Sequence, residues 1–275
     1  MWSVELAVAG AVVLALMFTG LWIPFAVGIA GLLIIYAEAG ANGFRALGLI
    51  TWSTLGGFTL TALPLFILMA ELLSNAGVGT RFFAGMAVLV RRLPGGLLQT
   101  NILGSALFAS ICGSSAATAA SIGTVALPQL DARGYDPKLS CGSLAAGGTL
   151  GILIPPSLTM IIYGSIAEVS IARLFIAGLV PGLALAALFS LYVMVRARLD
   201  PRVAPAEAAR AGLGEILRAL AELAPFVGLM LVVLGTIYLG IATPTESAAL
   251  GCVLAAVVGA VFGRLDRDVL RRTLT

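Results

Sequence analysis

The sequence predicts an all-α polytopic membrane protein. Its 275 residues are 60% hydrophobic and 11% charged, with a mean hydropathy of +1.08, whereas an ordinary soluble domain has about 25% charged residues. Apolar runs of about 20 residues, long enough to cross a bilayer, recur along the whole chain. Because they are not confined to the N-terminus, we do not expect a cleaved signal peptide.

The candidate spans follow from apolar runs between turn residues. They lie near 4–20, 22–40, 59–76, 95–112, 116–130, 138–167 (with a break), 171–195, 224–240 and 244–263. If 95–131 is a re-entrant hairpin, all of the 16 basic residues except Arg45 and Arg173 fall on one face. Since short cytoplasmic loops collect Lys and Arg, we expect that face to be cytoplasmic and the N-terminus to be periplasmic. Two close-packed full crossings over 95–131 are the alternative.

Between two apolar runs, residues 206–223 are too charged to span a bilayer. One helical face of this segment is apolar and carries Leu213, Ile216, Leu217, Leu220 and Leu223. This pattern predicts an amphipathic helix on the cytoplasmic surface that connects two halves of the protein. A soluble linker helix is the alternative.

Two segments 220 positions apart suggest an internal repeat: "GLWIPFAVGIAG", residues 20–31, and "GIATPTESAALG", residues 240–251. Glycine and proline recur at the same places in both. The first copy is expected to enter its span from the cytoplasm and the second from outside, and such inverted repeats are typical of secondary transporters. The same offset places the partners of the two breaks described next near 333 and 370, so we expect the chain to end within its second repeat.

Two polar breaks interrupt the apolar chain. The first is "GSSAATAAS", Gly113 to Ser121, at the predicted hairpin tip. The second contains Pro155 and Pro156, which lack an N–H and therefore leave the carbonyls four residues earlier without helical partners. In a membrane such backbone is tolerated only where protein covers it or where it lines a cavity.

The chemistry of these breaks suits a hard cation beside an anion. Freed carbonyls in 148–155 and the hydroxyls of Ser114, Ser115, Thr118 and Thr149 are neutral oxygens, which suit sodium. Helix starts near Ser115 and Ser157 would attract an anionic solute. The alternative is that these small and hydroxylated residues serve helix packing.

Other functions are disfavoured by what the chain lacks. It has no histidine and a single lysine, Lys138, and its three cysteines show no metal-ligand spacing, so we do not expect a membrane enzyme or a transition-metal site. The net charge of +3 is attributed to arginines facing anionic lipid, and no nucleic-acid partner is expected. Glu71 and Glu246 are either functional intramembrane acids or structural hydrogen-bonding groups.

Residues 108–182, including "ICGSSAATAASIG" and "GGTLGILIPPSLTM", closely resemble the large membrane (DctM-type) subunit of tripartite ATP-independent periplasmic (TRAP) transporters. The likeness extends over the chain, including "ALPLFILMAELL" and "ATPTESAALG". It implies an elevator-type, sodium-coupled permease of the bacterial inner membrane that imports organic acids such as C4-dicarboxylates. The implied partners are a small four-helix membrane subunit and a periplasmic substrate-binding protein.

The resemblance also implies functional residues. Its sodium site maps onto Gly113, Ser114, Ser115, Thr118, Gly148, Thr149, Gly151 and Pro155. The candidate substrate positions remain the two helix starts, at Ser115 and Ser157. The implied organisation is scaffold helices over 1–58, a transport segment over 59–200 with the hairpin (95–131) and the broken helix (138–167), a connecting helix over 201–223, and the start of a second repeat over 224–275. Family members continue further, so the alternative is a truncated permease or a non-transporting membrane scaffold.

Overall fold

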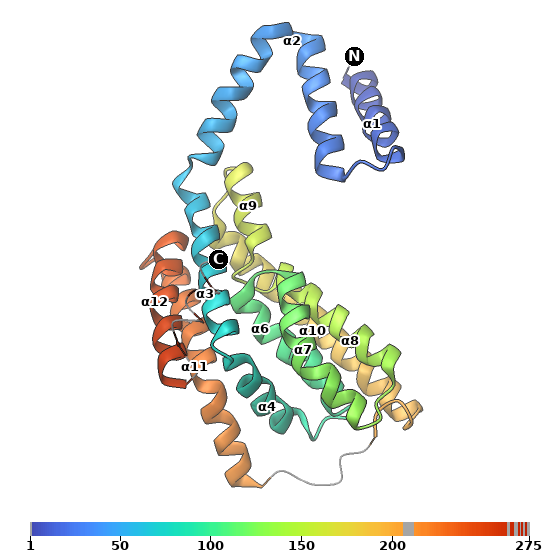
Figure 1. Ribbon diagram of the computed structural model, residues 1–275, viewed down its shortest axis with the longest axis vertical. Helices are drawn as coiled ribbons and strands as arrows, with labels where there is room; N and C mark the ends of the chain where they lie inside the picture. The colour runs from blue at the N-terminus through green and yellow to red at the C-terminus, as the bar shows by residue number, and fades with distance from the viewer. Residues whose placement is uncertain are drawn as a thin grey trace. The chain divides into compact units, whose positions relative to one another are not determined.

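The computed structural model describes residues 2–205, 212–262, 265, 266, 269, 271 and 273. Within those residues the chain forms helices joined by turns and contains no strand (Figure 1). It divides into two compact units, the first ending at Gly57 and the second starting at Phe58. Each unit is described by itself.

The first unit contains α1 (Trp2–Phe18) and α2 (Ile23–Leu55), which contact each other. Gly20 takes the positive φ of 84° that the turn between them needs. Helix α2 kinks at Gly40 (φ 55°, ψ −146°) and then continues to Leu55. The sequence predicts a span that ends at residue 40, so the helical segment after the kink is a finding of the structure.

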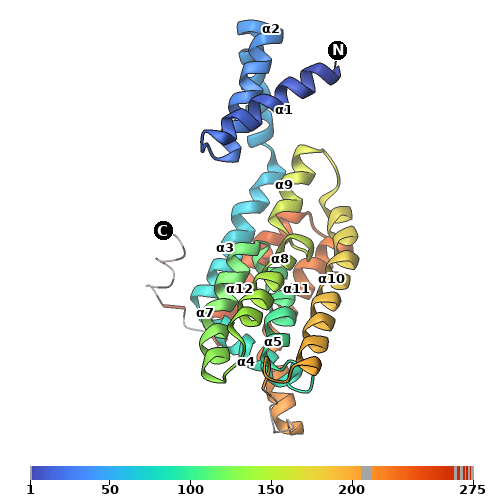
Figure 2. The same ribbon diagram turned by 90° about the vertical axis from the view of Figure 1, so that its right-hand side faces the viewer.

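The second unit holds the remaining helices. They are η1 (Phe58–Thr61), α3 (Ala62–Asn75), α4 (Val78–Val90), α5 (Leu97–Gln99), the π-helix η2 (Thr100–Gly104), α6 (Ser105–Cys112), α7 (Ser115–Ala132), α8 (Pro137–Leu153), α9 (Leu158–Ile166), α10 (Ile171–Leu199), α11 (Leu213–Tyr238) and α12 (Pro244–Phe262). Helix α3 lies beside α12 and α4 beside α11, while α6 and α7 lie against α8 (Figures 1 and 2).

Length and composition make six helical segments of the described chain candidates for membrane spans. They are Ile23–Leu55, Phe58–Asn75, Pro137–Ile166, Ile171–Leu199, Leu213–Tyr238 and Pro244–Phe262. Large apolar side chains stay exposed on them, including Val180, Leu231 and Val253, as lipid-facing residues of a bundle do. The predicted all-α polytopic membrane fold is confirmed.

The two repeat segments share a local structure. Gly240 takes a positive φ of 69°, like Gly20 in the first copy. Pro244 is the first residue of α12 and Pro24 lies in the first turn of α2, positions at which proline is compatible with a helix. Both segments are therefore turns into an apolar helix, and their inverted relation stays a prediction.

The connecting segment differs from its prediction. Residues 206–211 lie outside the described residues, and from Leu213 the chain forms one uninterrupted helix to Tyr238. Pro225 sits inside this helix without ending it, so residues 213–223 are not a separate helix. Arg91 at the end of α4 pairs with Glu215 in the first turn of α11 (Nη1 to Oε2, 3.8 Å).

An aromatic cluster holds the first arm of the hairpin against α4 and α11. The ring of Phe82 lies 6.0 Å from that of Phe108 and 4.8 Å from that of Phe226, centroid to centroid. Phe82 and Phe108 are almost completely buried, as is Phe226. Burying aromatic rings is among the largest apolar contributions that a side chain makes to stability. The cluster therefore helps to hold the first arm of the hairpin in place.

Candidate functional site

The hairpin tip is a tight reversal between α6 and α7. Gly113 ends α6 in the left-handed conformation (φ 60°), and its amide donates to the carbonyl of Ala109 (2.8 Å). Ser114 is extended and caps α7, its Oγ accepting from the amide of Ala117 (3.4 Å). The serine and glycine of "CGSS" therefore have separate tasks, because glycine tolerates the left-handed turn and serine supplies the helix cap.

The break lies in the long span that starts at Pro137. The last helical bond of α8 runs from the amide of Ile154 to the carbonyl of Leu150 (2.8 Å). The carbonyls of Gly151 and Ile152 would bond to amides at 155 and 156, but both are prolines. Helix α9 then restarts at Leu158, capped by Ser157, whose Oγ accepts from the amide of Met160 (3.5 Å).

The tip and the break touch backbone to backbone. The amide of Leu158, the first residue of α9, donates to the carbonyl of Gly113 (3.1 Å). A methyl group placed on Gly113 would lie 2.8 Å from the carbonyl oxygen of Pro156. One placed on Gly151 would lie 3.0 Å from the carbonyl carbon of Ser114 and 3.2 Å from the amide of Ser115. Only glycine permits this approach at either position.

Most of the predicted sodium ligands meet at this contact. A methyl group on Gly148 would lie 3.1 Å from the carbonyl oxygen of Ser115, so Gly148 also faces the hairpin. Thr118 is fully buried, and its Oγ1 has no hydrogen-bond partner among the described residues. Thr149 differs: it is exposed, and its hydroxyl donates to the carbonyl of Ala146 in its own helix (2.7 Å). Gly148, rather than Thr149, is the residue of that pair that reaches the tip.

The two predicted helix N-termini are not equivalent. In α9 the first amide is used by Gly113, and Ser157 is fully buried. In α7 the amides of Ser115 and Ala116 have no hydrogen-bond partner among the described residues. The positive end of a helix dipole with free amides attracts an anion, so the start of α7 is the better anion position.

The donor set at the contact consists of neutral oxygens. The oxygens are backbone carbonyls and the hydroxyls of Ser114, Ser115 and Thr118. The described residues contain no group of three or more His, Cys, Asp or Glu side chains that could hold a metal ion. This chemistry fits a hard monovalent cation with oxygen ligands.

A buried polar cluster beneath the tip was not predicted. Asn101 of η2 donates from Nδ2 to Oγ of Ser143 in α8 (2.9 Å). Gly147 allows α8 to pack closely against η2 and α6 here, because a methyl group on Gly147 would lie 2.8 Å from both the Asn101 carbonyl oxygen and Ser105 Oγ. Within the part of the chain that the structure describes, Asn101 Oδ1, Ser105 Oγ and Ser140 Oγ are buried and have no hydrogen-bond partner. The sequence signal was the polar "QTN" inside an apolar run, opposite Ser140, Ser143 and Gly147 at helical spacing.

The chain matches the family model described as "Tripartite ATP-independent periplasmic transporter, DctM component" over residues 11–275. It is 36% identical over 232 residues to the C4-dicarboxylate TRAP transporter large permease protein DctM of Pseudomonas aeruginosa, covering 84% of this chain and 53% of that protein. It is 34% identical over 200 residues to the ectoine TRAP transporter large permease protein TeaC of Halomonas elongata, covering 73% and 46%.

A further relative is the isethionate TRAP transporter permease protein DctMQ of Oleidesulfovibrio alaskensis, with 32% identity over 245 residues that cover 89% of this chain and 38% of that protein. The chain spans about half the length of the curated DctM relatives it matches, 53% in one and 52% in another. The family model covers nearly the whole chain, and six helical segments of the described residues are long and apolar enough to cross a membrane. The chain therefore belongs to the DctM family, the large permease component of tripartite ATP-independent periplasmic transporters, which are multi-pass proteins of the inner membrane.

Proposed function

We propose that this chain is part of a sodium-coupled permease that imports organic acids. The observation that carries the proposal is the contact between the hairpin tip and the break. The carbonyls of Gly151 and Ile152 have no helical amide partners there. In the first turn of α7, Thr118 buries a hydroxyl that has no partner among the described residues. Leaving such groups buried and unpaired costs about 1–3 kcal/mol each. A bound cation would supply the missing interaction.

The sodium ion would be held by oxygens of Gly113, Ser114, Ser115 and Thr118 on the hairpin, and of Gly148 and Gly151 on α8. Pro155 contributes by freeing the carbonyl of Gly151. Thr149 has less support, because its hydroxyl is exposed and already bonds to its own helix. Since the cation would join two separate segments, its binding would stabilise the tip against the break.

The substrate would be an organic anion bound at the start of α7, close to Ser115. The free amides there supply hydrogen-bond donors for a carboxylate, and the neighbouring cation would add to the attraction. Relatives are named for C4-dicarboxylate, isethionate and ectoine, so the substrate is proposed only as a class. We also propose, from the family, that a small membrane subunit and a periplasmic binding protein work with the permease.

Sodium binding can be tested through stability. Ligand that binds only the folded state stabilises it by RT ln(1 + [L]/Kd), about 1.4 kcal/mol at ten times Kd. We expect sodium chloride, compared with potassium chloride at equal ionic strength, to raise the midpoint of thermal unfolding of the purified chain. Thr118→Val, which removes the buried hydroxyl but keeps the shape, should abolish most of this shift.

Thr124→Val is the matched control, because Thr124 lies on the same helix but is exposed and donates to the carbonyl of Ser121 (2.9 Å). It should keep the sodium shift. Equal shifts in the two variants would contradict the assignment of Thr118. If the unsubstituted chain showed no sodium effect, the sodium-coupled permease would be wrong and a non-transporting membrane scaffold would be the better explanation.

A further inference from the structure

An apolar cavity of about 690 Å³, partly open to the surface, lies in the second unit. Of the residues predicted for the cation site, Pro155 alone lines it. Its walls come from α4, α6, α10 and α11, and Ile154 and Pro155 border it at the break. Of the described residues that line it, only Ser190 has a polar side chain, and its hydroxyl donates to Gln99 Oε1 (2.6 Å). A cavity without free polar groups does not hold water well, so its occupant should be a hydrocarbon.

The cavity extends along α10, from Leu179 to Met194. At a rise of 1.5 Å per residue this wall is about 22 Å long. One leaflet of a bilayer has a hydrocarbon thickness of about 15 Å. A lipid acyl chain lying along α10 would therefore fit within the cavity.

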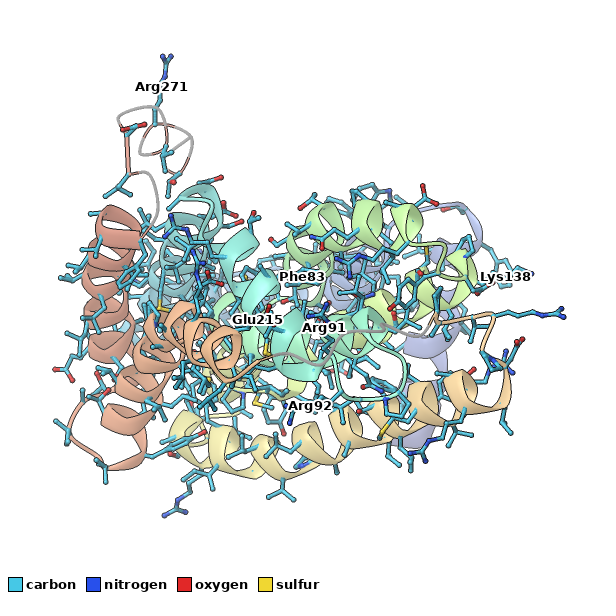
Figure 3. The ribbon with its side chains drawn as sticks, turned by 90° about the horizontal axis from the view of Figure 1, so that it is seen from below. Phe83, Arg91, Arg92, Lys138, Glu215 and Arg271 are labelled. Atoms are coloured by element: carbon cyan, nitrogen blue, oxygen red, sulfur yellow. The ribbon has the colours of Figure 1, made fainter. Side chains whose placement is uncertain are left out.

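Basic residues follow the lining residues at one end of the cavity. Val90 and Met194 line that end, and Arg91 and Arg92 follow Val90 directly, while Arg196 follows Met194 in the last turn of α10. Figure 3 looks onto this end of the unit and labels Arg91, Arg92 and Glu215 there. Glu215 pairs with Arg91 (3.8 Å), and Arg92 and Arg196 are exposed. The charge at this rim is thus positive.

We propose that the cavity binds one acyl chain of an anionic phospholipid, with the lipid phosphate beside Arg92 and Arg196. Lipid tails are as apolar as the cavity wall, so moving a chain from the bilayer into the cavity gains little by itself. Selectivity must come from the headgroup, because basic pockets between membrane helices attract anionic lipids. The acyl chain would fill space whose lining otherwise loses dispersion contacts. It would lie between the break and the helices α4 and α11.

The test is native mass spectrometry of the purified full chain with dioleoyl phosphatidylglycerol or dioleoyl phosphatidylcholine. We expect phosphatidylglycerol to bind several-fold more tightly. Ala187→Trp fills the cavity from an exposed position that lines it and should reduce lipid binding several-fold. Ala184→Trp, exposed on the same helix but outside the cavity lining, should not.

The headgroup is tested separately. Arg92→Gln should reduce the preference for phosphatidylglycerol and leave phosphatidylcholine binding unchanged, whereas Arg173→Gln, at the opposite end of α10, should change neither. Equal binding of the two lipids, or equal effects of the tryptophan variants at 184 and 187, would overturn the proposal. A dimer disrupted by Ala187→Trp would show instead that a second copy covers the cavity. If Ala187→Trp does not fold by circular dichroism, Leu183→Trp, also exposed and lining the cavity, replaces it.

Discussion

Gly151 allows the break to contact the hairpin tip because its side chain is only a hydrogen atom. A methyl group at this position would lie 3.0–3.2 Å from backbone atoms of Ser114 and Ser115. Backbone atoms at a helix start cannot rotate away as a flexible side chain can. The contact between tip and break thus depends on the missing β-carbon at 151 as much as on any polar group.

We expect Gly151→Ala to destabilise the protein by about 1–3 kcal/mol, the usual cost of overfilling a packed site. Gly142→Ala is the control on the same helix, because a methyl group there meets nothing within 4 Å. It should be neutral or stabilise by about 0.5–1 kcal/mol, since alanine favours a helix over glycine. Thermal unfolding of the two purified variants measures the difference. Similar midpoints would mean that α8 can move away from the tip without loss.

At this scale the sequence located both helix breaks but not the role of each residue in them. The hydroxyls of 113–121 and the prolines at 155 and 156 marked both breaks correctly. Sequence reasoning could not separate Gly148 from Thr149, because neighbouring helical residues point about 100° apart and only the packing decides which one faces the hairpin. The same limit hid Asn101, whose partner Ser143 is 42 residues away along the chain.

Among the elements, the hairpin and α10 are joined by one buried amide. Gln99 is fully buried, and its Nε2 donates to the carbonyls of Pro94 (3.0 Å) and Ser190 (3.0 Å) while its Oε1 accepts from Ser190 Oγ. These bonds hold the first turn of the hairpin to the last third of α10. Buried polar groups satisfied in this way specify one packing arrangement.

Gln99→Met keeps the length of the side chain and removes all of these bonds. We expect a loss of about 1–3 kcal/mol, because the Ser190 hydroxyl and the Pro94 carbonyl lose their hydrogen-bond partner. The double variant Gln99→Met/Ser190→Ala should recover part of that loss, since the orphaned hydroxyl is gone. Chemical denaturation of the single and double variants measures the coupling. Strictly additive effects would show that Gln99 and Ser190 do not act as a pair.

Helix boundaries were predictable where a helix is long and apolar, and less so elsewhere. The spans at 171–195 and 244–263 correspond to Ile171–Leu199 and Pro244–Phe262. Helix α4 was missed, because its 13 residues contain Arg81 and are too short to be recognised as a span. The continuation of α11 through Pro225 was missed because proline usually marks a helix end.

For the whole molecule, the two ends of the second unit differ in charge. The ends of α4, α7 and α10 and the starts of α8 and α11 lie at one end (Figure 1). Hydrogen bonds between segments hold this arrangement. The amide of Asp136 donates to the carbonyl of Val203 (3.1 Å), and the amide of Leu97 donates to the hydroxyl of Tyr135 (3.2 Å). Both arms of the hairpin therefore leave from the same end.

The hairpin tip reaches only as far as the break, beyond which α9 continues for nine residues. That the tip stops inside the bilayer stays a prediction.

The orientation of this unit in the membrane follows from the same charges. Lys138 is exposed at the start of α8, at the basic end, and Arg173 is exposed at the start of α10, at the opposite end. Because basic residues concentrate in cytoplasmic loops, we expect a membrane-impermeant maleimide to label Arg173→Cys in intact cells with a permeable outer membrane. Lys138→Cys should react only after the inner membrane is opened. Both variants are placed in a background without Cys112, Cys141 and Cys252. The reverse pattern would invert the topology, whereas labelling of both positions from outside would mean that Pro137–Ile166 does not cross the membrane, and the hairpin could not then be re-entrant from the cytoplasmic side.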